Sequence, residues 1–332
     1  MIKRPIVGLV GAGNIGGTLA HVVASRGLAD VVLYDKDAGL AQGKALDISH
    51  SLAIEAKAGC VTGTGDFKEL VGCQVCVVTA GFARAPGMNR KDLLAKNVAV
   101  FQEIAAHIRT HTPLALVVVV TNPLDVMTWV MQKLTGLPHN RVMGMAGALD
   151  SGRFASLLAE ALDVSVQDIK TMVLGGHGDL MVPLLSATSV QGVPLRHFLD
   201  DGALSVAALD ALIQRTRDGG AEIVRLLQKS SAYYAPAEAC FVMLKALLRN
   251  EQRLLPCASW LGDTRVPHVY GGHDLYTGVP AVLGREGVER VWAAPLTADE
   301  KTMFAQSVSD IAEDLQSVES LLAERASTRN VV

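Results

Sequence analysis

Short apolar runs rich in β-branched residues alternate with helical stretches through the first half of the chain. The clearest strand candidates are residues 6–10, 31–34, 75–79 and 114–121. Residues 116–120 are apolar without interruption, which is typical of a strand covered on both faces, as the strands of parallel sheets are. The pattern therefore predicts an α/β fold, with repeated βαβ units around a doubly wound parallel sheet.

The pattern changes after residues 143–147, where longer helical segments begin. A short apolar run at 171–174 predicts one further strand. We expect a first domain over 1–147 and an α+β domain over 148–325. From residue 297 on, apolar positions recur at spacings of four and three, which predicts an amphipathic helix docked on the rest of the chain. These positions are Phe304, Val308, Ile311, Leu315, Val318 and Leu322.

Composition narrows the class of protein. Half of the 332 residues are hydrophobic and 19% are charged, as in folded chains that bury a large sheet. The net charge of -3 comes without a basic stripe, which argues against nucleic acid as a partner. The sequence contains neither a signal-peptide pattern nor an apolar stretch long enough for a membrane helix. Five irregularly spaced cysteines fit a reducing compartment, so we expect a cytoplasmic protein.

Two pairs of residues have metal-ligand or redox spacing. Cys73 and Cys76 are three apart, but Cys76 enters an apolar strand and no second pair accompanies them, so buried thiols are expected. His107 and His111 are four apart without a third ligand nearby. We therefore predict no metal site.

A glycine-rich turn follows the first predicted strand and opens a helical pattern. Glycines let the backbone approach a pyrophosphate at the positive end of that helix. The second strand ends in Asp35, where a carboxylate can accept hydrogen bonds from ribose hydroxyls and repel a 2′-phosphate. Together these features predict a Rossmann domain that prefers NAD, although the glycines alone would also suit a structural turn. The turn residues expected to hold the cofactor are Gly11, Ala12, Gly13, Asn14, Ile15 and Gly16.

Candidate catalytic residues lie around the domain boundary and after the strand at 171–174. His177 is flanked by glycines, and histidine takes and returns a proton near neutrality, as hydride transfer from an alcohol requires. Asp150 and Arg153 are three apart, a spacing that places both on one face of a helix. They would suit a carboxylate that orients His177 and a cation that grips a substrate carboxylate. On spacing alone, a local ion pair between Asp150 and Arg153 is the better interpretation. The sequence by itself does not show whether His177 lies beside Asp150.

Two arginines, Arg84 and Arg90, lie in a segment with glycines and a proline after the strand at 75–79. Ligands bind beyond the carboxyl ends of parallel strands, so this segment is placed to act as a lid over an anionic substrate. Asn122 follows the strand at 114–121 and precedes a proline. It would suit contact with nicotinamide ribose or a substrate oxygen, or simply open a turn.

Taken together, these residues resemble the lactate/malate dehydrogenase family, in particular its malate dehydrogenases of the lactate-dehydrogenase-like type. The resemblance implies that His177 is the acid/base, that Asp150 orients it and that Arg153 binds the carboxylate next to the reacting carbon. It covers essentially the whole chain, and the segments that carry it are the glycine turn with Asp35, the lid 84–90, and residues 121–123, 150–153, 175–179 and 231–236.

The resemblance also implies roles around the lid and the cofactor. Arg90 would polarise the substrate carbonyl when the lid closes. Arg84 would pair with the second carboxylate of malate or oxaloacetate, where lactate enzymes have an uncharged residue. Because an unpaired buried arginine is unfavourable, pyruvate should be rejected. Asn122 would contact substrate and cofactor, and further cofactor contacts are expected at Asn97, Val120 and Thr121.

Some positions depart from the family pattern. Ala85 replaces a lysine often found in the lid, Leu180 replaces a threonine, and Glu238 stands where a small residue is common. The first two would be able to alter lid closure or affinity. Residues 262–273 look longer than their family counterpart and are predicted to form a surface loop.

The sequence thus predicts an NAD-dependent malate dehydrogenase that reversibly oxidises (S)-malate to oxaloacetate, an activity of the tricarboxylic acid cycle. A lactate or other 2-hydroxy acid dehydrogenase is the alternative enzyme. A nicotinamide-sensing module without catalysis is the alternative of a different class, since fold does not imply function. Because the family forms dimers and tetramers, we expect a homotetramer or a homodimer.

Overall fold

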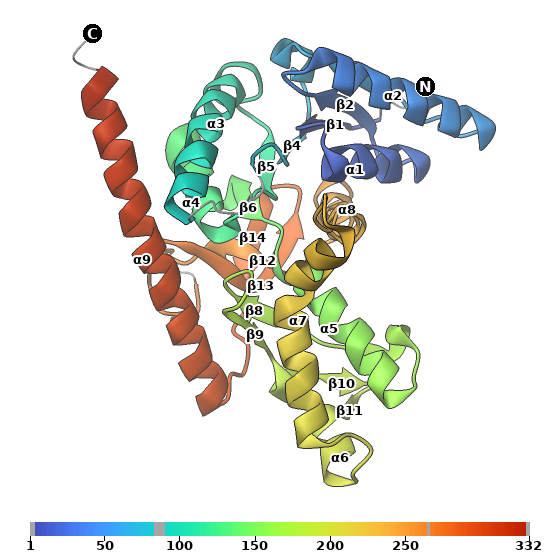
Figure 1. Cartoon of the computed structure of the whole chain (residues 1–332), viewed down its shortest axis with the longest axis vertical. Helices are drawn as coiled ribbons and strands as arrows, with labels where there is room; N and C mark the ends of the chain where they lie inside the picture. The colour runs from blue at the N-terminus through green and yellow to red at the C-terminus, as the bar shows by residue number, and fades with distance from the viewer. Residues whose placement is uncertain (1–3, 83–89, 264–265, 330–332) are drawn as a thin grey trace.

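A twisted parallel sheet organises the N-terminal half of the chain, in the upper part of Figure 1. The computed structural model describes residues 4–82, 90–263 and 266–329, with the side chains of all of these except 90, 91 and 324–329. Neighbouring strands pair in the order β3-β2-β1-β4-β5-β6, all of them parallel. The order reverses between β1 and β4, the switch point at which doubly wound sheets bind dinucleotides. The strands are β1 (Ile6–Val10), β2 (Asp30–Tyr34), β3 (Val61–Thr64), β4 (Val75–Val78), β5 (Leu116–Val119) and β6 (Val142–Gly144).

Helices cover both faces of this sheet, as the uninterrupted apolar strands require. Every residue of β4 and β5 is buried. Gly136 follows the last residue of α4, and its φ of 67° is the left-handed conformation that glycine adopts without strain. The helices of this half are α1 (Asn14–Ser25), α2 (Ala38–Ile54), α3 (Arg90–His111) and α4 (Leu124–Thr135), with 3-10 turns η1 (Phe67–Leu70) and η2 (His139–Arg141).

The strand predictions for this half are largely confirmed. The strand at 6–10 has the predicted bounds, and β2 and β4 differ from theirs by one residue. The prediction for 114–121 was too long. Leu114 is 82% exposed and Thr121 lies beyond the end of β5, because an apolar run marks a strand without marking the turns that bound it.

The sheet continues from β6 into antiparallel strands of the C-terminal half, where β12 pairs with both β6 and β13. The predicted strand at 171–174 corresponds to β8, which begins at Val173. The strands that extend the main sheet are β12 (Arg253–Trp260), β13 (Tyr276–Gly284), β14 (Gly287–Val291), β8 (Val173–Gly175) and β9 (Met181–Pro183). A small separate sheet contains β7 (Ile169–Lys170), β10 (Ser189–Val190) and β11 (Val193–Pro194).

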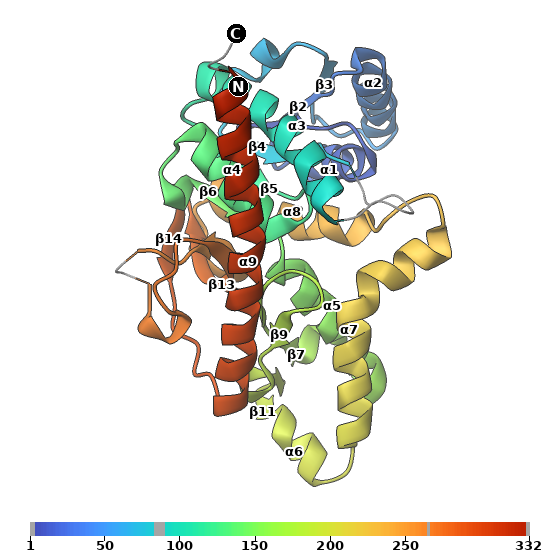
Figure 2. The ribbon, with the colours of Figure 1, turned by 60° about the vertical axis from the view of Figure 1, so that its left-hand side comes forward.

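Helices of the C-terminal half pack on each other and on these strands. Helix α7 lies along α5 in both ribbon views (Figures 1 and 2). Glu238 of α8 forms a two-pronged ion pair with Arg26, the residue that follows α1, at 2.6 and 2.8 Å. This pair explains a charge at a position where a small residue was expected. The remaining helices are α5 (Gly147–Leu162), α6 (Leu195–Asp200), α7 (Val206–Leu227) and α8 (Tyr234–Leu248), with 3-10 turns η3 (Val166–Asp168), η4 (Leu185–Ala187) and η5 (His268–Tyr270).

The predicted C-terminal amphipathic helix is α9 (Ala298–Arg329). Figure 2 shows it crossing the molecule, and it contacts α3, α4, β8 and β9. Five of the six predicted core positions are buried and Leu322 is half-buried. The helix therefore joins both halves of the chain, with its polar side facing outward.

Two other sequence expectations have different outcomes. Cys73 and Cys76 are buried free thiols, as predicted, with their Sγ atoms 3.2 Å apart. The prediction of a surface loop over 262–273 was wrong in part, because Val266 and Tyr270 are buried. The Tyr270 hydroxyl donates to the Trp292 carbonyl at 2.8 Å and accepts from the Ala294 N–H at 2.7 Å. A tyrosine tip with two partners can be buried without an unpaired polar group, and this anchors the segment.

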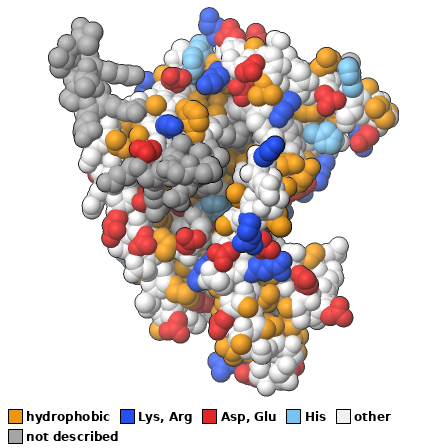
Figure 3. All heavy atoms as spheres, in the orientation of Figure 1, with side chains coloured by type: hydrophobic (Ala, Val, Ile, Leu, Met, Phe, Trp, Pro, Cys, Tyr) orange, Lys and Arg blue, Asp and Glu red, His pale blue; other side chains and the backbone are white. Residues whose placement is uncertain are grey.

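Charge is dispersed over the face shown in Figure 3, where acidic and basic side chains are interspersed with hydrophobic ones. Within the described ranges, none of the helices combines the length and the apolar character needed to cross a bilayer.

Candidate active site

His177 lies in a tight turn after β8 that α9 supports. Gly175 has a φ of 77°, which favours glycine, and the Gly176 N–H donates to Ser307 Oγ of α9 at 2.7 Å. A side chain at Gly176 would meet Ile311 of α9, 3.1 Å from an added Cβ. The two glycines therefore allow the turn to lie directly against the C-terminal helix.

The structure brings His177 and Asp150 together. Asp150 is in the first turn of α5 and is almost completely buried, and its Oδ2 lies 2.9 Å from His177 Nδ1. With an ionised carboxylate, this contact favours the tautomer that carries hydrogen on Nδ1. Nε2 is then the ring nitrogen without a hydrogen, so it is the one that can accept a proton.

The protonation of His177 reflects two opposing effects. Burial would lower its pKa, but the charges of Asp150 and Asp125 and the hydrogen bond to Asp150 outweigh burial and the repulsion from Arg153. The pKa of His177 is therefore raised above 6.5. The imidazolium form of His177 is thus stabilised relative to that of a free histidine.

Arg153 lies one helical turn after Asp150 on α5, as the spacing predicted. Its Nη1 is 3.5 Å from Asp150 Oδ1, and its side chain is 15% exposed. Burial lowers the pKa of Arg153 despite the attraction of Asp150. Among the described residues, the ion pair with Asp150 involves a single nitrogen of this mostly buried guanidinium, which leaves other donors for an anionic ligand.

A second carboxylate beside His177 was not identified from the sequence. Asp125, in the first turn of α4, accepts the backbone N–H of His177 through Oδ2 at 2.9 Å. Burial raises the pKa of Asp125 to about 6, although the His177 N–H and the His177 charge oppose this. The sequence signal that could have found it is a lone charged residue in the otherwise uncharged run 124–132.

The glycine turn has the backbone geometry needed to approach a pyrophosphate. Gly11 has a φ of 109°, and an added Cβ would lie 2.7 Å from the Ala80 nitrogen. An added Cβ at Gly13 meets nothing within 4 Å. Helix α1 starts without a side-chain cap or an acidic residue in its first turn, so its N–H groups are available to an anion. The turn fits a dinucleotide phosphate.

Other predicted cofactor residues surround this turn. Asp35 Oδ2 accepts the Ala12 N–H at 2.7 Å, which places its carboxylate at the turn. Ile15, in the first turn of α1, is half-buried. Asn14 Nδ2 donates to Ser230 Oγ at 3.0 Å, which links the turn to the segment before α8. Gly16 packs too closely against the Gly11 carbonyl to carry a side chain.

Asn97 is buried and bonded to the protein on both of its polar atoms. Its Oδ1 accepts the Phe82 N–H at 2.7 Å, and its Nδ2 donates to the Asn122 carbonyl at 2.8 Å. It thereby connects the described end of the lid segment to the loop after β5. In that loop Val120 and Thr121 are buried, whereas Asn122 is exposed. The contact of Asn97 with NAD stays a prediction.

The lid predictions fall on the boundary of the described structure. Arg84 and Ala85 lie outside the described residues. Arg90 is the first residue of α3, and the structure describes its backbone but not its side chain. On the His177 turn, Leu180 is half-buried one residue before β9.

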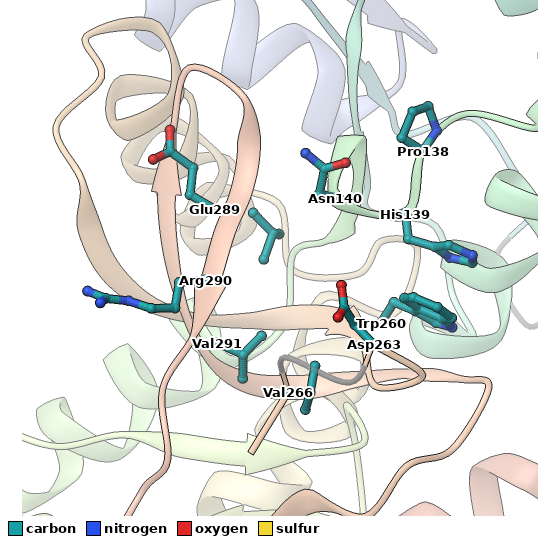
Figure 4. A pocket seen from close by; sticks show the side chains of 10 residues that line it. Pro138, His139, Asn140, Trp260, Asp263, Val266, Glu289, Arg290 and Val291 are labelled. Carbon is teal, nitrogen blue, oxygen red and sulfur yellow. The ribbon is translucent and has the colours of Figure 1, made fainter. Parts of the chain in front are cut away.

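A cavity of about 510 Å³ contains none of these predicted site residues. Figure 4 shows Trp260 and His139 beside it, and their rings stack with centroids 3.6 Å apart. Trp260 Nε1 donates to Asp274 Oδ1 at 2.8 Å, and His139 Nδ1 lies 3.1 Å from the Tyr276 hydroxyl. The indole nitrogen of Trp260 and Nδ1 of His139 are thus both bonded within the protein.

Comparison with known proteins agrees with the geometry. A sequence model described as the lactate/malate dehydrogenase NAD binding domain matches residues 6–144, and one described as the lactate/malate dehydrogenase alpha/beta C-terminal domain matches residues 147–322. The chain belongs to the lactate/malate dehydrogenase family. The predicted family, fold class, NAD cofactor and enzyme class are confirmed: it is an NAD-dependent dehydrogenase that acts on a CH–OH group.

Relatives within the lactate/malate dehydrogenase family carry both names. The malate dehydrogenase of Caulobacter vibrioides is 47% identical over 310 residues, which are 93% of this chain and 95% of the relative. The crystal structure of Cryptosporidium parvum malate dehydrogenase has a TM-score of 0.91 at 36% identity and covers 96% of this chain and 100% of its own. The lactate dehydrogenase of the same organism, complexed with lactic acid and NAD, has a TM-score of 0.91 at 38% identity, with coverages of 96% and 99%. Overall shape therefore does not separate the two substrates.

Proposed function

We propose that this dehydrogenase interconverts (S)-malate and oxaloacetate, with His177 as the acid/base. The observation that carries the chemistry is the shared anchor of the site: the imidazole of His177 and the guanidinium of Arg153 lie at the two different oxygens of Asp150. A proton acceptor and a carboxylate-binding cation are therefore held in a fixed relation. The similarity to a bacterial malate dehydrogenase supports the choice of substrate.

The roles follow from this geometry. His177 Nε2 takes the hydroxyl proton during malate oxidation and returns it during oxaloacetate reduction, while Asp150 stabilises the imidazolium. Arg153 holds the carboxylate next to the reacting carbon by a two-pronged contact. NAD, when bound, accepts the hydride, and NADH returns it. Arg90 polarises the carbonyl and Arg84 pairs with the second carboxylate, two roles that rest on the family resemblance.

The cofactor is held along the carboxyl edge of the parallel sheet. The N–H groups at the start of α1 bind the pyrophosphate, and Asp35 binds the adenosine ribose. Asn122, exposed after β5, contacts the nicotinamide ribose and the substrate. Val120 and Thr121 line the same edge, and Asn97 positions the Asn122 backbone to which it is bonded.

Three further expectations belong to the same proposal. The division into 1–147 and 148–325 is supported by the end of the parallel strands at β6 and by the start of α5 at Gly147. A homotetramer or homodimer is supported by exposed apolar residues on α2 and α7, among them Ile54 at 87% and Leu226 at 72%. Five free thiols fit a cytoplasmic location.

The first experiment compares NADH oxidation with oxaloacetate and with pyruvate for the wild type, Arg84→Gln and a control, Arg196→Gln. Arg196 is suitable because its side chain on α6 is 87% exposed. We expect the wild type and the control to prefer oxaloacetate strongly, and Arg84→Gln to lose at least about tenfold of that preference because a charged partner is removed. A preference for pyruvate in the wild type would replace the malate assignment with a lactate or other 2-hydroxy acid dehydrogenase.

The alternative substrate has a specific observation in its favour, since the lactate-bound relative matches this fold as closely as the malate dehydrogenase does. The same assay decides between them. If NADH binds and neither substrate reacts, the non-catalytic sensing module becomes the better interpretation. His177→Gln then provides the reference for background activity.

A further inference from the structure

We propose that Asp125 is a positioning residue of the hydride-transfer site, which fixes the His177 turn through the backbone and places a second carboxylate next to the imidazole. The inference rests on the proposed function, because it assigns Asp125 a role in the proton transfer by His177. It adds a contribution from α4, on the cofactor side of the molecule, to a catalytic pair held by α5 and β8.

The first observation is the hydrogen bond itself. The backbone N–H of His177 lies 2.9 Å from Asp125 Oδ2, across 52 residues of sequence. The neighbouring Gly176 N–H is bonded to Ser307 Oγ, and the imidazole to Asp150. Residues of three different helices, α4, α5 and α9, thus hold the Gly176 N–H, the His177 N–H and the His177 imidazole of one turn. Asp125 is the residue that holds the backbone N–H of His177 itself.

The second observation is the burial of a charge with few partners. Asp125 is 6% exposed, and its Oδ1 has no hydrogen-bond partner among the described residues. A buried carboxylate with one unpaired oxygen is unfavourable for folding. Helix α4 gains only modestly from an acidic residue in its first turn. Stability alone therefore does not account for a carboxylate here, whereas a function beside His177 does.

The charge of Asp125 acts on the proton equilibrium of the base. Among the described side chains, the charged groups that act on His177 are Asp125 on α4 and Asp150 and Arg153 on α5, and α9 contributes the neutral hydroxyl of Ser307. Asp150 and Asp125 raise the pKa of His177, and Arg153 lowers it. Removing the charge of Asp125 should consequently lower that pKa. The base of malate oxidation would then be neutral at lower pH, and the acid of oxaloacetate reduction would lose its proton at lower pH.

Two substitutions separate the charge from the hydrogen bond. Asp125→Asn removes the charge and keeps an oxygen that can accept the His177 N–H, whereas Asp125→Ala removes both. Asp201→Asn is the matched control, because Asp201 also accepts a backbone N–H, from Ala203 at 3.0 Å, but lies exposed at the end of α6. Each variant is checked for NADH binding by fluorescence and for melting temperature.

The decisive measurement is the pH profile of kcat/KM for malate oxidation and for oxaloacetate reduction. In Asp125→Asn we expect the acid limb of oxidation and the alkaline limb of reduction to move to lower pH by about one unit. In Asp125→Ala we expect the same shift and, in addition, a roughly tenfold lower plateau of kcat/KM, because the turn loses its anchor. The control should follow the wild type.

Unshifted limbs in Asp125→Asn overturn the proposal, as does a lower plateau without a shift, which would leave Asp125 with a structural role only. NMR titration of ¹³C-labelled histidine, with the His177 signal assigned from His177→Gln, gives the same test without turnover. If the wild type reacts with neither substrate, the proposed function fails, and the titration still shows whether Asp125 controls the protonation of His177.

Discussion

Replacing Asp125 by asparagine should stabilise the protein, and by more at neutral than at acidic pH. The pKa of this carboxyl is raised from 3.8 to about 6, with burial as the largest cause. A carboxyl with a raised pKa binds its proton more tightly in the folded than in the unfolded state. Its contribution to stability is fully present below the unfolded pKa and is lost as the pH rises through the folded pKa.

The size of the effect follows from the shift. At about 1.4 kcal/mol per pKa unit, a rise from 3.8 to about 6 corresponds to about 3 kcal/mol lost between low and neutral pH. About half of this loss is complete by pH 5, because the unfolded chain releases its proton first, and the remainder follows between pH 5 and pH 7. The asparagine variant does not titrate and escapes the loss.

Melting temperatures of the cofactor-free enzyme at pH 5 and pH 7, at one protein concentration, measure this difference. The advantage of Asp125→Asn over the wild type should grow by about 1.4 kcal/mol between these pH values. At roughly 2 °C per kcal/mol for a large chain, this is about 3 °C. Asp201→Asn should melt within about 1 °C of the wild type at both pH values, since the only ion pair of Asp201 among the described residues, with His197 at 3.7 Å, is exposed to solvent and such pairs contribute little.

A difference between Asp125→Asn and the wild type that stays constant with pH would refute this reasoning, because it would show that Asp125 ionises equally easily in both states. An advantage that shrinks as the pH rises would mean that the ionised carboxylate stabilises the fold. The ion would then be better paired than its contacts with the His177 turn indicate.

Three other predictions test the site and the core. Asp150→Asn should lower kcat by about three to four orders of magnitude and leave NADH binding unchanged, because neutralising the carboxylate of a His–Asp pair has an effect of this size. A loss of kcat below tenfold in steady-state assays would contradict the role of Asp150 beside His177. Ser307→Ala leaves the buried Gly176 N–H without its acceptor and should lower the free energy of unfolding, measured by urea denaturation, by about 1 to 3 kcal/mol. An unchanged midpoint of urea denaturation would show that Ser307 of α9 does not support the turn. Of the five thiols, Cys60 alone is exposed, and burial raises the pKa of Cys240 to about 12 and that of Cys257 to about 11. Ellman titration should therefore detect one thiol per chain at once and the other four only after denaturation. Rapid labelling of more than one thiol would show that the buried ones are accessible.

Features encoded over short distances could be predicted from the sequence. The strand at 6–10, the glycine turn and the amphipathic helix α9 all follow from periodicity and from residue types that only a few backbone conformations accept. The pairing of the turn with Asp35 also lies within 23 residues. Because hydrophobic patterning specifies which face of each element is buried, it determined the fold class as well.

The composition of the site depended on tertiary contacts over longer distances. Residue types identified His177, Asp150 and Arg153 as candidates, but spacing alone favoured a local ion pair for the last two. Only the packing of β8 against α5 brings His177 within 2.9 Å of Asp150. The burial of Tyr270 was likewise invisible in a segment that is polar by composition.

Sequence by itself determined a doubly wound, NAD-binding α/β dehydrogenase and indicated His177 as its candidate base, because glycine turns, apolar periodicity and reactive residue types are local properties. Tertiary structure alone decided what surrounds that base: Asp125 from 52 residues away, and Ser307 from 131 residues away through the adjacent glycine. The physical reason is that hydrogen bonds and buried charges act over a few ångströms in space. Which residues share that space is set by how the helices pack on the sheet, and no spacing along the chain records it.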